Sequence, residues 1–121
     1  MNQKQTARWF STVSIILFLF GVLYTIWGLG ILPVQKDVLL EWESALYGAI
    51  MMGWGTTLFF VGRIAIERSD SALMKAMLYG ITVWLVIEAL FSARLGVWFN
   101  VGVDAGVLAL FTIPLMANIK K

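Results

Sequence analysis

Charged positions are few along this chain and separate long apolar stretches. The first stretch covers residues 9–32, and the second begins after Glu43. Two later stretches approach the same length only if they include Glu88 and Asp104. A helix needs roughly 20 mostly apolar residues to cross a bilayer. The pattern therefore predicts four membrane-spanning helices, over residues 9–32, 44–66, 72–93 and 95–117.

The connections between these predicted helices are short, and the chain of 121 residues leaves no room for a separate soluble module. Helices joined in this way alternate in direction across the membrane. We therefore expect an all-α integral membrane protein, with residues 1–121 forming one domain built as an up-down-up-down bundle of four transmembrane helices.

The basic residues predict the orientation of the bundle. Two of the nine, Lys36 and Arg94, fall in the first and third connections. The other seven lie beside the termini or around the second connection: Lys4, Arg8, Arg63, Arg68, Lys75, Lys120 and Lys121. Basic residues concentrate on the cytoplasmic side of membrane proteins. Both termini and the second connection are therefore predicted to be cytoplasmic.

Composition supports the membrane class and excludes several kinds of chemistry. Hydrophobic residues make up 60% of the chain and charged residues 13%, against roughly 25% charged residues in a soluble domain. The chain has no cysteine and no histidine, which excludes disulfides, thiol nucleophiles, Cys/His zinc sites and haem ligated by these side chains. We expect no cofactor and no metal. The net charge of +2 reflects helix flanks, so nucleic acid is not an expected partner.

The most informative polar residues belong to the last two predicted helices. Glu88 and Asp104 are carboxyls inside apolar stretches, and Arg94 lies in the connection between those helices. Asn100 precedes Asp104 by four residues and so shares its helix face. Trp84 precedes Glu88 by the same spacing. We expect these residues to converge near the outer leaflet.

Three interpretations of this group remain open, because ionisable residues inside a membrane are either paired or functional. In the first, Arg94 neutralises one acid and Asn100 binds the other, which joins the two helices. In the second, the group is a ligand or ion site at the outer mouth of the bundle, with Trp84 as its floor. In the third, Glu88 or Asp104 takes part in proton-coupled chemistry.

Small residues predict where helices approach one another, because close packing drives helix association in lipid. They recur every seven positions in the first two predicted helices, at Ser14, Gly21, Gly28, Gly48, Gly55 and Gly62. This period favours antiparallel packing of those helices, although chance repetition is the alternative with 11 glycines. Gly102 and Gly106 form a second small-residue face, which can contact a helix of this chain or of another copy.

Residues 44–117 contain "LYGAIMMGWGTTLFFVGR", a short basic connection, "LYGITVWLVIEALFSARLG" and a last helix with Asn100 and Asp104. In this order of features the chain resembles small bacterial four-helix membrane proteins of the DoxX-like type, which mostly have no assigned activity. The resemblance implies a four-helix bundle in the bacterial cytoplasmic (inner) membrane. It assigns no role to any residue.

Three functions are compatible with these features. The first is a non-enzymatic binding or assembly partner within the bilayer, whose partners are lipids, a second copy of the chain or another membrane protein. The alternative is a transporter or channel for a small solute, ion or lipid that uses Glu88 and Asp104. The third, an intramembrane lipid-modifying enzyme, requires Glu88, Asp104 and Arg94 as acid, base and electrostatic clamp.

Overall fold

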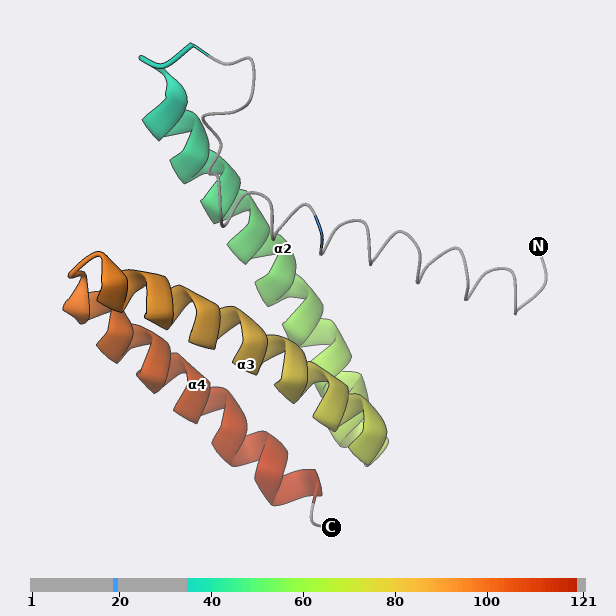
Figure 1. Ribbon diagram of the computed structural model, residues 1–121. Coiled ribbons are helices and arrows are strands. Elements are labelled where there is room, and N and C mark those ends of the chain that lie inside the picture. The colour runs from blue at the N-terminus through green and yellow to red at the C-terminus, as the bar shows by residue number, and fades with distance from the viewer. Residues whose placement is uncertain (1–18, 20–34, 120–121) are drawn as a thin grey trace, which may run out of the picture. The chain divides into compact units, whose positions relative to one another are not determined.

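A computed structural model describes Leu19 and residues 35–119, and this part of the chain is helical apart from short turns (Figure 1). Its long helices are α2 (Leu39–Glu67), α3 (Ser71–Arg94) and α4 (Trp98–Ile119). All three are long and apolar enough to cross a membrane. The sequence therefore predicted the all-α membrane class correctly.

The chain divides into two compact units, Met1–Ile50 and Met51–Lys121, and the boundary between them lies within α2. The helix predicted over residues 9–32 lies outside the described residues except for Leu19, which is helical and exposed. The α3–α4 hairpin and the second half of α2 belong to the second unit.

Helix α2 begins at Leu39, five residues before the predicted start at residue 44. In the first unit, a turn over residues 36–38 leads into it. Glu41 and Glu43 interrupt the apolar stretch, but neither residue breaks a helix. Glu41 lies in the first turn, where a carboxylate favours the positive end of the helix dipole. The apolar pattern thus locates the membrane-compatible part of α2 and misses its polar start.

The turn between α2 and α3 is a Schellman motif followed directly by a helix cap. The Asp70 N–H donates to the Ala65 carbonyl at 2.9 Å and the Ser69 N–H donates to the Ile66 carbonyl at 3.1 Å, which satisfies the last carbonyls of α2. Ser69 has φ 51°, in a region that glycine adopts more easily. The Asp70 carboxylate then accepts from the Leu73 N–H at 2.9 Å. Asp70 is therefore the N-cap of α3.

A second Schellman motif reverses the chain between α3 and α4. The Val97 N–H donates to the Ser92 carbonyl at 2.8 Å, the Gly96 N–H donates to the Ala93 carbonyl at 3.1 Å, and Gly96 has φ 77°. Residues 95–97 therefore form a turn, so α4 begins at Trp98 and not at the predicted residue 95. Apolar turn residues look like helix in a hydropathy pattern, and this explains the difference.

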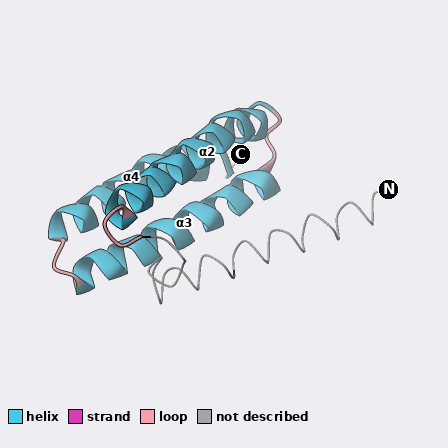
Figure 2. Ribbon diagram, turned by 90° about the horizontal axis from the view of Figure 1, so that it is seen from above, coloured by secondary structure: helices cyan, strands magenta, loops and turns pink. Residues whose placement is uncertain are grey.

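Helices α3 and α4 pack against each other in antiparallel directions (Figures 1 and 2). Pro114 lies inside α4, which continues to Ile119. At the far end of this pair, the Ser71 hydroxyl donates to the Ile119 carbonyl at 3.5 Å. The start of α3 and the end of α4 are therefore adjacent.

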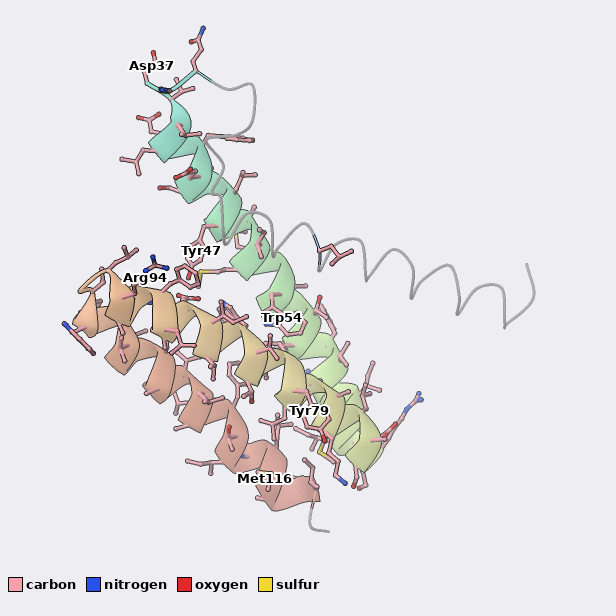
Figure 3. All side chains as sticks on the ribbon, in the orientation of Figure 1. Asp37, Tyr47, Trp54, Tyr79, Arg94 and Met116 are labelled. Atoms are coloured by element: carbon pink, nitrogen blue, oxygen red, sulfur yellow. The ribbon has the colours of Figure 1, made fainter. Side chains whose placement is uncertain are left out.

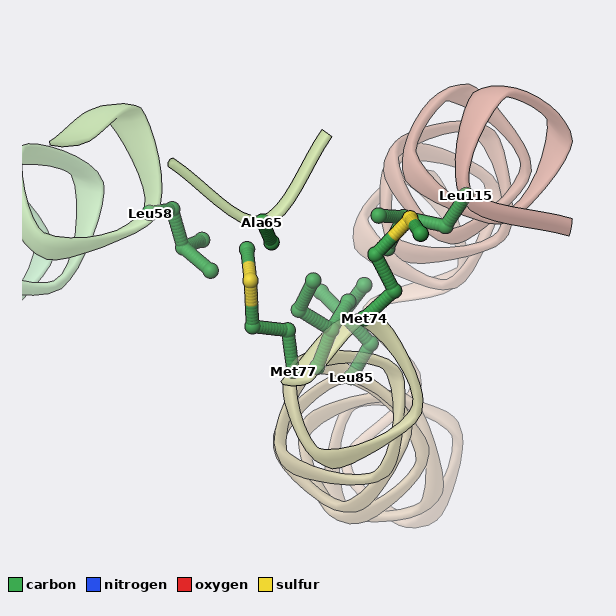
Figure 4. Close-up of a cluster of buried hydrophobic side chains, with 7 residues drawn as sticks. Leu58, Ala65, Met74, Met77, Leu85 and Leu115 are labelled. Carbon is green, nitrogen blue, oxygen red and sulfur yellow. The ribbon is translucent and has the colours of Figure 1, made fainter. Parts of the chain in front are cut away.

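The buried apolar cluster of the described residues joins the second half of α2 to α3 and α4 (Figure 4). Met77 of α3 extends toward Leu58 and Ala65 of α2, and Met74 of α3 extends toward Leu115 of α4 (Figure 4). Methionine suits such a junction because its unbranched side chain fills irregular space. The core is otherwise small, since most large apolar side chains of the three helices are exposed.

Candidate functional site

The candidate site is a polar cluster between α3 and α4, close to the turn that connects them. Glu88 and Ser92 are four residues apart on α3, and Asn100 and Asp104 are four residues apart on α4. Residues at this spacing share one face of a helix. Because the turn over residues 95–97 reverses the chain, these two faces meet.

Asn100 is the centre of the cluster. Its side-chain nitrogen Nδ2 lies 2.9 Å from Ser92 Oγ, 3.1 Å from Asp104 Oδ2 and 3.3 Å from Glu88 Oε1. The amide group has two N–H bonds to donate, and three acceptors surround it. One donor group thus links two residues of α3 to one residue of its own helix.

Burial shows how strongly Asp104 depends on this arrangement. Asp104 is only 3% exposed and is the buried polar residue of the described range, while Glu88, Ser92 and Asn100 are half-buried. A buried polar group that loses its hydrogen bond costs about 1–3 kcal/mol. Within residues 35–119, no buried side-chain nitrogen or oxygen lacks a hydrogen-bond partner. The buried polar side chains of α3 and α4 are therefore satisfied inside the chain.

Arg94 lies outside this cluster. It is exposed at the C-terminal end of α3 (Figure 3), and it makes no ion pair with any residue in the range 35–119. Six residues separate it from Glu88, which is about 240° around a helix, so the two side chains leave α3 on different sides. Its charge is favourable in the last turn of α3, where the helix dipole is negative. The structure thus brings together Glu88, Asn100 and Asp104 of the predicted group without Arg94.

Trp84 is half-buried and packs against the apolar cluster that contains Ile81 and Leu85. It is one helical turn from Glu88, as its spacing requires. In this position the tryptophan contributes to the packing below the polar cluster. No hydrogen bond between Trp84 and Glu88, Asn100 or Asp104 is present.

Sequence reasoning missed Ser92. The hydroxyl oxygen of Ser92 is the nearest of the three acceptors around Asn100. The available signal was its position four residues after Glu88, on the face already assigned to polar contacts. Serine is common in membrane helices and often bonds its own backbone, which is why the residue type alone gave no indication.

The predicted helix-packing glycines have different surroundings. A Cβ added at Gly62 would lie 3.2 Å from Met77 Cε of α3, so α2 and α3 approach closely there. At four other glycines, an added Cβ would meet no atom of the described chain within 4 Å: Gly48, Gly55, Gly102 and Gly106. Ser14, Gly21 and Gly28 lie outside the described residues. The small-residue face of α4 is therefore open in this part of the chain.

The contacts of the cluster are hydrogen bonds between and within the two helices, and Glu88 and Asp104 both contact the Asn100 amide. Within residues 35–119, no three side chains of histidine, cysteine, aspartate or glutamate are arranged to hold a metal ion. No protein-family model, no curated protein and no solved structure matches the chain.

Proposed function

We propose that the chain is a non-enzymatic four-helix membrane protein that acts as a binding or assembly partner in the bilayer. The observation that carries this proposal is the Asn100 cluster. Its donor group joins α3 to α4, which supports a structural role for the two acids near the turn between these helices. The surfaces left for partners are then the outer faces of the helices.

The exposed apolar surface supports the same proposal. In each apolar window of the three helices, less than one fifth of the residues are buried within the chain. The Gly102 and Gly106 side of α4 is also free of neighbours in the described chain. Close approach of another helix at such positions is how membrane helices gain packing energy. We propose this face of α4 as the contact with a partner helix.

The four-helix arrangement, the orientation and the location are part of this proposal. The first helix is residues 9–32, both termini are cytoplasmic, and the polar cluster lies near the outer leaflet of a bacterial cytoplasmic membrane, as in DoxX-like proteins. The basic residues around the α2–α3 turn support the orientation. An impermeant thiol reagent added to intact cells should label a cysteine placed at Leu95 and should leave one placed at Ala72 unlabelled. The reverse result would contradict this orientation.

Single cysteines also test the assembly proposal, because the chain has no cysteine of its own. In native membranes, the variant Gly102→Cys should form a disulfide or bifunctional cross-link to a partner chain. A second probe is Leu110→Cys, at a highly exposed position four residues after Gly106 and therefore on the same face of α4. Both cysteines could react equally with a lipid-soluble maleimide while neither forms a disulfide or cross-link to a partner chain. In that case the α4 face has no partner and the assembly proposal fails.

Transport through the cluster is the alternative function. It is supported by two acids that meet at one amide between two helices. Solute or ion flux into liposomes should be absent, or should be unchanged by Glu88→Gln and Asp104→Asn, if the cluster is structural. Flux that disappears in both variants while their unfolding midpoints stay within the range of the wild type would favour transport.

A further inference from the structure

The ends of all three helices in the second unit meet at the side opposite to the polar cluster. Helix α2 ends at Glu67, α3 begins at Ser71, and the Ser71 hydroxyl contacts the Ile119 carbonyl at the end of α4. Figure 3 shows Tyr79 and Met116 toward this end and Arg94 at the other. We call the basic residues here, Arg63, Arg68 and Lys75, the basic end; all three are exposed.

The acidic residues near the basic end are already engaged. Glu67 pairs with Arg63 at 3.6 Å, and the Asp70 carboxylate caps α3 through the Leu73 N–H. Within residues 35–119, no ion pair involves Arg68 or Lys75. The sequence also continues from Ile119 into Lys120 and Lys121, which adds two positive charges after the last helix. Positive charge therefore exceeds negative charge at this end, whereas the α3–α4 turn carries only Arg94.

The exposure of Tyr79 supports a position of the basic end at a membrane surface. Tyr79 follows Lys75 by four residues on α3, so the two side chains share a helix face. The tyrosine is 68% exposed, and such rings prefer the boundary between lipid tails and headgroups. Lysine beside it can lie along the apolar surface and extend its ammonium group to the headgroup layer.

We propose that the basic end binds the phosphate of an anionic phospholipid headgroup through Arg68 and Lys75. The guanidinium of Arg68 suits phosphate oxygens because it presents several N–H groups in one plane. A zwitterionic lipid carries its own cation and gains less from this surface. Each basic residue near an anionic surface strengthens binding by about fivefold. This proposal is independent of the assembly proposed for the α4 face.

Lipid competition observed by native mass spectrometry tests the proposal. The purified full-length chain is presented with equal amounts of phosphatidylglycerol and phosphatidylcholine, and the retained lipids are counted. The wild type should retain more phosphatidylglycerol. In the variant Arg68→Gln/Lys75→Gln, the ratio of retained phosphatidylglycerol to retained phosphatidylcholine should fall at least fivefold. The control Arg94→Gln, at the opposite end, should keep the wild-type ratio.

Three outcomes would overturn the proposal. The double variant could retain the wild-type preference, or Arg94→Gln could lose as much as the double variant does. Millimolar inorganic phosphate could also displace the retained lipid, which would assign the surface to free phosphate. Equal thermal unfolding midpoints of all variants in the same detergent show that a lost preference does not result from unfolding. The charge-conserving variant Arg68→Lys/Lys75→Arg should keep most of the wild-type preference.

Discussion

Helix α3 contacts its two neighbours through different chemistry. Toward α4, it contributes Glu88 and Ser92 to hydrogen bonds with Asn100. Toward α2, the Met77 side chain packs against Gly62, and the neighbouring side chains are apolar. The same helix thus combines a polar contact on one side with van der Waals packing on the other.

The difference matters because lipid tails are as apolar as the side chains that they replace. A helix gains little from burying leucine against another helix instead of lipid, so shape fit and hydrogen bonds determine which helices stay together. The α3–α4 pair has both kinds of contact, whereas α3 meets the second half of α2 through van der Waals packing at Met77 and Gly62. We expect α3 and α4 to separate last when the protein unfolds.

Replacing Asn100 should lower the free energy of unfolding most, because Asn100 makes the polar contacts between α3 and α4. The variant Asn100→Leu keeps the branched shape of the side chain and removes the donor for Glu88, Ser92 and Asp104. We expect a loss of about 2–3 kcal/mol in the free energy of unfolding, because two contacts between helices disappear and a buried carboxyl loses its donor. Denaturation with sodium dodecyl sulfate in bicelles measures this change.

The matched control for Asn100 is Asn118→Leu on the same helix. The Asn118 amide donates to the Pro114 carbonyl, one turn earlier in α4, at 2.8 Å. No contact with α3 is lost, so the free energy of unfolding should change by less than about 1 kcal/mol. Equal losses in the two variants would show that the Asn100 cluster does not hold α3 to α4.

Two glycines of α2 test its shape fit with α3. In Gly62→Leu the new side chain must displace Met77, and overpacking of this kind costs about 1–2 kcal/mol. Gly55→Leu, two turns earlier, meets no described neighbour within 4 Å and replaces a poor helix former, so it should be neutral or stabilising. Unfolding in the same bicelles measures both. A loss at Gly55 equal to that at Gly62 would contradict the assignment of α3 as the helix that packs here, and would favour a partner for α2 beyond the described residues.

Substitutions in the two turns that flank α3 should change the stability of the protein in opposite directions. Ser69 and Gly96 occupy equivalent Schellman positions with positive φ. Ser69→Gly should stabilise the α2–α3 connection by about 0.5 kcal/mol, and Gly96→Ala should destabilise the α3–α4 connection by about 1 kcal/mol. Thermal unfolding in detergent should show midpoints that move in opposite directions. Midpoints that move together would indicate that backbone strain is not the cause.

The smallest effect is expected at Arg63. Its guanidinium lies 3.6 Å from Glu67 and 5.7 Å from the centre of the Phe59 ring, but the side chains of the ion pair are 65% and 66% exposed. Exposed pairs of this spacing contribute about 0.3–0.5 kcal/mol. Arg63→Gln should therefore change the unfolding free energy by no more than this, with the difference reduced further at high salt. A loss as large as that of Asn100→Leu would show that the ion pair joins helices.

The sequence predicted the helices well where apolar length alone defines them. The expected bounds for α3, residues 72–93, differ from Ser71–Arg94 by one residue at each end, because Asp70 and Gly96 provide clear signals for a cap and a turn. The start of α2 and the start of α4 were each misplaced by several residues. Glutamates can continue a helix, and leucine and valine can occupy a turn, so hydropathy does not distinguish these cases.

The candidate site was predictable from spacing and only partly from residue type. Four-residue spacing placed Asn100 with Asp104, and the short connection placed Glu88 opposite them. Charge reasoning added Arg94, although its angle around α3 takes it away from Glu88. Ser92 was absent from the prediction because a hydroxyl carries no charge to mark it. Angular position on the helix would have corrected both errors.

The three-residue turn between α3 and α4 also has a consequence for membrane insertion. A single α4 entering lipid exposes Asn100 and Asp104, and a single α3 exposes Glu88, at a cost of about 3 kcal/mol for each charged group. When both helices enter together, these groups bond to one another across a turn that forms locally. The hairpin from Ser71 to Ile119 thus brings Glu88, Ser92 and Asp104 to the Asn100 amide within one segment, and the two helices should pass from the translocation channel into lipid as one unit.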